Sequence, residues 1–256
     1  MSLVGVAPVL AAGLFLGLLA LLEIGLRIGQ RQRARDPIGG GAGAVEGAVF
    51  GLLGLMIAFT FSGASSRFEG RRELIVEEAN DIGTAWLRID LLPAEAQAPL
   101  RELFRRYLDS RLDTYRKAIN VEMAMEEYAR STKLQGEIWA YAVAACRANA
   151  APEAARLLLP ALNQMIDITT TRLMATRTHP PGIVFVLLVA LALAGALLAG
   201  FAMAEGKGRS WVHMLSFAAV LATTVWITID LEYPRLGLIR VDAADFVLED
   251  LRRSMD

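Results

Sequence analysis

The chain has 256 residues, of which 55% are hydrophobic, and this composition indicates a membrane protein with a sizeable polar portion. The formal net charge is −1, so there is no basic excess of the kind that binds nucleic acid. The chain has one cysteine and two histidines, and it shows no phosphate-binding loop, nucleophile motif or metal-ligand spacing. We therefore expect neither an enzyme nor a cofactor or metal site.

Four apolar stretches are long enough to cross a bilayer core of ~30 Å at ~1.5 Å per helical residue. They are residues 3–26, 44–62, 183–204 and 211–229. Short turns at 27–43 and 205–210 would join them into two hairpins. We therefore expect one transmembrane hairpin within residues 1–65 and a second within residues 179–231.

The region between the hairpins, residues 66–178, is polar and shows no strand-like alternation. Four segments carry an apolar face at helical spacing and predict a soluble helical bundle. They lie at about 66–92, 95–118, 122–149 and 153–178. We expect the C-terminal segment, residues 232–256, to pack on this soluble layer. The predicted fold is an all-α integral membrane protein in which two hairpins flank the bundle.

The second membrane segment continues into the polar region without a proline. Two tracks of residues spaced by seven predict one helix of roughly 45 residues shared by both layers. The tracks are Gly47, Gly54, Phe61, Phe68, Ile75, Ile82, Ile89 and Gly51, Ala58, Ser65, Arg72, Ala79, Trp86. Packing within one subunit and lining a shared axis in an oligomer both fit this pattern.

An apolar stripe on this helix is a candidate pore constriction. Leu53, Ile57 and Phe61 stand four residues apart, which places them on one helix face. Such a ring can gate a pore by dewetting, whereas the simpler interpretation is contact with lipid or another helix. Phe50 and Phe59 are the alternatives if the helix is rotated differently.

Charged residues mark the join of the two layers. Asp230 and Glu232 close the last span, and Pro234 ends its helix. We expect these carboxylates to pair with nearby arginines in an architectural role, with ion coordination as the alternative. The candidate arginines are Arg67, Arg71, Arg72 and Arg235. The polar group at Glu77, Glu78, Asn80 and Asp81 is interpreted as a solvated face or as a partner for arginines elsewhere in the bundle, with cation binding by Glu77 and Asp81 as the alternative.

Two segments, EEANDIGTAWLRIDLLP and DLEYPRLGLIRVD, resemble the bacterial bestrophin-like domain family. A more remote similarity to true bestrophins lies in the two hairpins around a helical middle and the long second helix. Bestrophins are pentameric anion channels, and the resemblance implies a homo-oligomeric, chloride-conducting channel whose partners are membrane lipids and inorganic anions. Leu53, Ile57 and Phe61 would match the neck of apolar residues on the second helix. The acidic run of a calcium clasp is missing, so we expect no calcium gating.

The resemblance also implies a bacterial inner-membrane protein, but two signals disagree about its orientation. Arg27, Arg31, Arg33 and Arg35 in the first turn place that turn in the cytoplasm by the positive-inside rule, and the bundle outside. Bestrophins have a cytoplasmic bundle. The alternative to a channel is a non-conducting membrane scaffold or sensor whose helical domain binds a partner protein.

Overall fold

A computed structural model describes residues 3–35, 43–148, 152–204, 209–235, 237–241 and 244–256. Its helices, in chain order, are α1 (Leu3–Arg35), α2 (Gly43–Arg88), α3 (Ala94–Arg116), α4 (Val121–Ala148), α5 (Pro152–Arg177), α6 (Gly182–Met203), α7 (Trp211–Glu232) and α8 (Phe246–Ser254). A 3-10 turn, Ile89–Leu91, follows α2. The described residues contain no strand, so the predicted all-α fold is confirmed.

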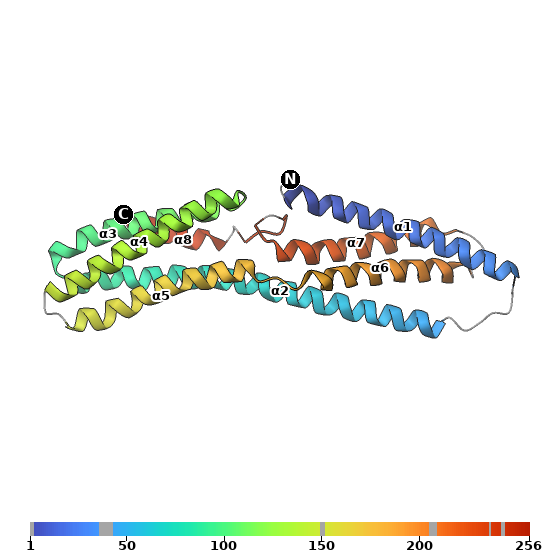
Figure 1. Cartoon of the computed structure of the whole chain (residues 1–256), viewed down its shortest axis with the longest axis horizontal. Coiled ribbons are helices and arrows are strands. Elements are labelled where there is room, and N and C mark those ends of the chain that lie inside the picture. Colours follow the sequence, from blue (N-terminus) through green and yellow to red (C-terminus); the bar gives the residue numbers. More distant parts are fainter. Residues whose placement is uncertain (1–2, 36–42, 149–151, 205–208, 236, 242–243) are drawn as a thin grey trace. The chain divides into compact units, whose positions relative to one another are not determined.

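Four helical stretches of the described chain are long and apolar enough to cross a membrane, as predicted. The second lies in α2, which is one unbroken helix of 46 residues (Figure 1) and continues into the polar region. The prediction of a first turn over residues 27–43 was wrong at its start, because α1 continues to Arg35. Arginine, glutamine and alanine are good helix formers, and no glycine or proline follows Gly29 until Pro37. Residues 36–42 and 205–208 of the two predicted turns lie outside the described residues.

The chain divides into two compact units. The first, called here the membrane unit, comprises Met1–Arg67 and His179–Ile239. The second, called here the bundle unit, comprises Phe68–Thr178 and Arg240–Asp256. Because α2 spans residues 43–88, it contributes its first half to one unit and its second half to the other.

Small residues let α1 and α6 approach closely in the membrane unit. A Cβ on Gly25 would overlap the carbonyl group of Leu197, and one on Gly200 would overlap that of Leu22. Gly29, one turn after Gly25, also faces α6, where a Cβ would lie 2.7 Å from the Phe201 carbonyl oxygen. Helices in lipid gain little from apolar burial and associate through such close backbone packing. α7 completes this core with Met214, Ala218, Ala222 and Val225.

The bundle unit has an aliphatic and aromatic core. Its largest buried side chains include Ile75 and Ile82 of α2 and Phe104 and Tyr107 of α3. α3 packs on α4, and α4 packs on α5. The C-terminal helix α8 packs on α3, where Arg252 pairs with Asp109 at 2.8 Å. Burial of these apolar surfaces from water stabilises this unit in the ordinary way of soluble bundles.

Candidate functional site

The membrane half of α2 is poorly covered by its own subunit. Only 6% of the most apolar stretch of α2 is buried, against 22–28% for the other three spans. A Cβ added at Gly47, Gly51 or Gly54 would meet nothing within 4 Å. A membrane helix with a glycine-rich uncovered surface is suited to close packing against other helices or against copies of itself.

One face of α2 does pack inward. Leu53 is 3% exposed and contacts the surface of α6 at Gly195. Phe50 meets Phe217 of α7 edge to face, with ring centroids 6.3 Å apart. Thr60 is buried on the same side and donates its hydroxyl to the Met56 carbonyl at 2.8 Å. These contacts fix the rotation of α2 about its axis.

The opposite face is free within the described subunit. At 100° per residue, Leu55 and Ser62 lie about 180–200° from Leu53, with Gly51 and Ala58 beside them. All four are exposed. Phe59 flanks this face and is 69% exposed, and Leu55 is 51% exposed. Leu55 and Phe59 are therefore bulky neighbours at i and i+4, and Leu52, 52% exposed, lies beside Phe59.

The structure distributes the predicted stripe differently from the sequence interpretation. Leu53 lies in the buried core of the membrane unit, and Ile57 packs partly against that core. Phe61 is 43% exposed. The Leu53 side chain is enclosed by its own subunit, and its part in a pore constriction stays a prediction. Of the two alternatives, Phe50 also packs inward, whereas Phe59 points away from the core.

The residues of the first seven-residue track are exposed at the start of α2 and buried near its end. Seven residues of a straight α-helix rotate ~20° short of two full turns, so a heptad track drifts around the helix. Along α2 the first track begins at exposed Gly47 and Gly54 and ends at fully buried Ile82. It therefore leaves the open face in the membrane half and enters the subunit's own core in the bundle half.

The predicted acidic pair at the end of α7 is buried. The Glu232 side chain is fully enclosed and accepts hydrogen bonds from Arg67 Nε at 2.7 Å and from the other end of the same guanidinium. His179 Nδ1 lies 3.3 Å from Glu232 Oε2, and the His179 ring stacks on Tyr233. Both Arg67 donors reach the same oxygen, Glu232 Oε1, and this charge-assisted contact ties the second helix to the end of the last span.

Asp230, two residues before Glu232, bonds backbone N–H groups. Its carboxylate accepts the backbone N–H groups of Leu238 at 3.1 Å and Ile239 at 2.7 Å, and so caps the turn after α7. A Cβ on Gly237 would overlap this carboxylate, which would have to move and give up its hydrogen-bond geometry to make room. Arg235 lies half-buried in the same turn.

Arg71 and Arg72, both in the bundle unit, make contacts within that unit. Arg71 donates to the carbonyls of Ala175 and Thr178, both at 3.1 Å. It thereby satisfies carbonyl groups at the C-terminal end of α5. Arg72 is exposed and pairs with Glu69 at 3.0 Å, one turn earlier on α2. The expected carboxylate partner of Arg72 is thus a local one.

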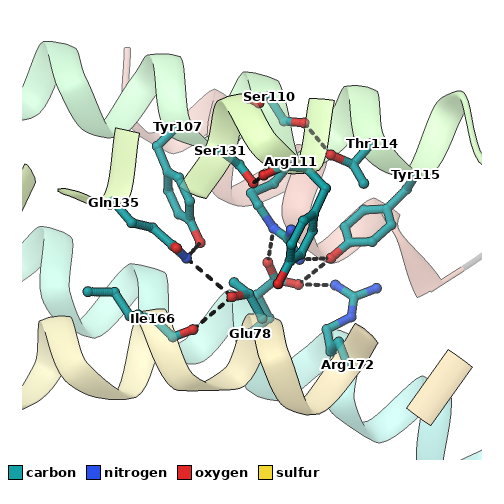
Figure 2. Close-up of polar contacts among 12 residues, drawn as sticks. Glu78, Tyr107, Ser110, Arg111, Thr114, Tyr115, Ser131, Gln135, Ile166 and Arg172 are labelled. Atoms are coloured by element: carbon teal, nitrogen blue, oxygen red, sulfur yellow. Dashed lines mark hydrogen bonds and ion pairs between the residues drawn. The ribbon is translucent and has the colours of Figure 1, made fainter. Parts of the chain in front are cut away.

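A polar cluster inside the bundle unit joins α2, α3 and α5 (Figure 2). Its centre is Glu78, which is fully buried. Arg111 donates its Nε to Glu78 Oε1 at 2.6 Å, and Arg172 bonds the other oxygen. The Tyr115 hydroxyl donates to Glu78 Oε2 at 2.8 Å, and the Arg172 guanidinium lies 4.0 Å from the Tyr115 ring centroid. Two guanidiniums face one carboxylate, so the cluster carries a net positive charge.

The cluster shifts the pKa values of its members. Burial by itself would raise the pKa of Glu78, but the charges of Arg111 and Arg172 and the hydrogen bonds from Arg111 and Tyr115 outweigh it and lower the pKa to about 2. Burial also raises the pKa of the Tyr115 hydroxyl, which keeps that group a proton donor.

A pH dependence of stability follows from the Glu78 pKa. Its unperturbed value is 4.5, so the stabilisation is complete above pH 4.5 and is lost progressively as the pH falls toward 2. We expect hydrogen-exchange protection of α3 and α5 to fall over this range in the purified protein. In a Glu78→Gln variant, the hydrogen-exchange protection should depend less on pH over this range. Unchanged protection from pH 5 to pH 2 would contradict the assignment.

Sequence reasoning identified the acidic group at residues 77–81 but not which member is buried. Glu77 is exposed, while Glu78 one residue later lies in the core. The available signal was register, because Glu78 follows Ile75 by three residues and precedes Ile82 by four on the apolar face of α2. No three His, Cys, Asp or Glu residues of the described chain are grouped so that they could hold a metal ion.

Comparison with known proteins agrees with this architecture. A crystal structure of a bacterial bestrophin homologue from Klebsiella pneumoniae, carrying a tyrosine-to-alanine mutation, is similar with a TM-score of 0.67 and 16% identity over 94% of this chain and 97% of that one. A membrane protein with a proline-to-alanine substitution is similar with a TM-score of 0.67 and 15% identity over 96% and 98%. No curated protein matches the chain.

These likenesses establish the fold, while the family rests on a separate match. The model of the Bestrophin-like domain matches residues 12–246, which is most of the chain and reaches from within α1 to the first residue of α8. The protein therefore belongs to the bestrophin-like domain family.

Proposed function

We propose that the protein is a homo-oligomeric ion channel of the bacterial inner membrane, with α2 of each subunit lining a shared pore. The observation that carries the proposal is the uncovered membrane half of α2, which is 6% buried in its own subunit. Its glycines have open space beside them, so equivalent helices could approach closely around an axis. A pentamer is the stoichiometry that the family resemblance implies.

The constriction is proposed at Leu55 and Phe59. These are the bulky side chains on and beside the face of α2 that points away from the subunit core. A ring of such apolar groups can block ions by excluding water from a narrow pore. Ile57 and Phe61 stand on the side of α2 nearer the core, so they are the competing pair if the helix rotates on assembly.

Ion flux from liposomes tests both parts of this proposal. We expect Leu55→Ala and Phe59→Ala each to raise flux severalfold, because a smaller ring lowers the dewetting barrier. Ile57→Ala and Phe61→Ala should change it less. Val186→Ala, at a 63% exposed position on α6, serves as the matched control. If Ile57→Ala and Phe61→Ala raise the flux more than Leu55→Ala and Phe59→Ala do, the constriction lies at Ile57 and Phe61. No flux from correctly assembled protein would favour the scaffold or sensor alternative.

The ion selectivity of the proposed channel has two candidates, anions and cations. The family resemblance implies anions, chloride among them. The exposed face of α2 in the bundle half, however, carries Glu69, Glu73 and Glu77 at i, i+4 and i+8, with Arg72 as a nearby cation paired to Glu69. Acidic rings favour cations in a pore. Reversal potentials in unequal KCl distinguish the two, and a cation preference that falls in Glu73→Gln would assign it to this face.

A further inference from the structure

The membrane unit has an apolar groove that the channel proposal does not use. Its volume is about 620 Å³, and it lies between α1, α6 and α7. Leu22, Met203, Phe217 and Leu221 are among its apolar lining residues, and His213 and Ser216 add polar atoms from α7. Val220, which also lines it, is 65% exposed, so the groove opens at the side of the helices.

One end of the groove meets a charged cluster. Glu23 comes directly after the lining residue Leu22. Its carboxylate forms an ion pair with Arg27, whose Nε lies 2.6 Å away, and a second ion pair with the Arg209 guanidinium. One carboxylate and two guanidiniums leave this cluster with a net positive charge. The guanidinium side chains are 66% and 42% exposed, and each has further N–H donors beyond those that bond Glu23. His213, which lines the groove, has its Nδ1 2.6 Å from the Ser210 hydroxyl.

Neighbouring aromatic structure places this cluster at the membrane surface. Trp211 begins α7, is 54% exposed, and has Arg209 5.1 Å from its ring centroid. Exposed tryptophans and arginines at the ends of membrane helices occupy the headgroup level of a bilayer. The groove thus has an apolar body along the span and a cationic mouth at the interface.

We propose that this groove binds an anionic phospholipid. The acyl chain lies along Leu22, Phe217 and Leu221, and the phosphate is bound at the mouth by Arg27 and Arg209. The charge of the mouth is the argument for this occupant over a neighbouring subunit or a neutral lipid, because the net positive cluster complements a phosphate monoanion. The inference is independent of ion conduction.

Native mass spectrometry of the intact assembled protein tests the proposal. The probes are phosphatidylglycerol and phosphatidylcholine with the same chains, added at equal concentration. We expect the protein to retain phosphatidylglycerol about fivefold more than phosphatidylcholine, which is the effect of one basic residue at an anionic membrane surface. Arg209→Gln should remove the preference, because it neutralises the net charge of the mouth. Arg106→Gln, an exposed arginine on α3 in the bundle unit, changes the net charge equally and should leave the preference intact.

A second variant tests the groove itself. Ser216→Trp fills the groove from α7 and should lower the retention of phosphatidylglycerol and phosphatidylcholine alike, because the acyl chain loses its site. Leu215→Trp introduces the same side chain at an adjacent exposed position outside the groove and should have no effect. Equal retention in all variants would overturn the proposal. Unchanged retention together with a smaller oligomer in Ser216→Trp would overturn it in favour of a subunit contact.

Discussion

Replacement of Glu78 by Gln is expected to destabilise the bundle unit by about 3–5 kcal/mol, the range found when one member of a buried ion pair is removed. Glu78 is the carboxylate that neutralises Arg111 and Arg172, which are 1% and 7% exposed. A neutral amide keeps the size of the side chain but leaves two buried guanidiniums without a counter-charge. The loss should appear as reduced hydrogen-exchange protection of α2, α3 and α5 together, because the cluster joins these three helices.

Glu77→Gln is the matched control, since it makes the same chemical change at an exposed neighbour. A surface change of this kind usually stays within about 0.5 kcal/mol. Adding Arg172→Met to the Glu78→Gln variant should recover part of the stability, because it removes one of the two uncompensated charges. If Glu78→Gln and Glu77→Gln are equally stable, the carboxylate does not hold the bundle together.

Gly25→Ala is expected to disrupt the packing of α1 on α6. The added methyl group would overlap the Leu197 carbonyl, and backbone atoms cannot move aside as a flexible side chain can. Overpacking of this kind costs about 1–3 kcal/mol, occasionally more. Thermal unfolding in detergent should show a lower midpoint, and the fraction of assembled protein should fall.

Gly13→Ala provides the comparison on the same helix. A Cβ at Gly13 would meet nothing within 4 Å, so this change should be neutral or slightly stabilising through the better helix propensity of alanine. A Gly25→Ala protein as stable as Gly13→Ala would mean that α1 and α6 are less closely packed than described.

The difference between the two glycines illustrates why contacts were harder to predict than elements. Both lie in α1, and each is followed by a second glycine four residues later, Gly17 and Gly29, so glycine spacing does not distinguish them. Only the neighbouring helix determines that one position is crowded and the other open. The same holds for Gly237, whose neighbour Asp230 folds back over the turn after α7.

The rotation of α2 was also decided by tertiary structure. The sequence predicts the length of the helix, because an apolar run continues into an amphipathic one without a proline. It does not fix which face is inward, since a seven-residue track drifts by ~20° per heptad and changes its neighbours over 46 residues. For that reason Leu53 faces α6, while Leu55 and Phe59 lie on the open surface.

The sequence by itself determined the all-α class, the four apolar spans, the polar bundle between them and the continuity of α2. These follow from local properties: the length of apolar runs, the helical period and the placement of prolines. Tertiary structure alone decided that Glu78 is buried while Glu77 is exposed. The physical reason is that its partners, Arg111 and Arg172, lie 33 and 94 residues away along the chain, and only folding brings their charges within hydrogen-bonding distance of one carboxylate.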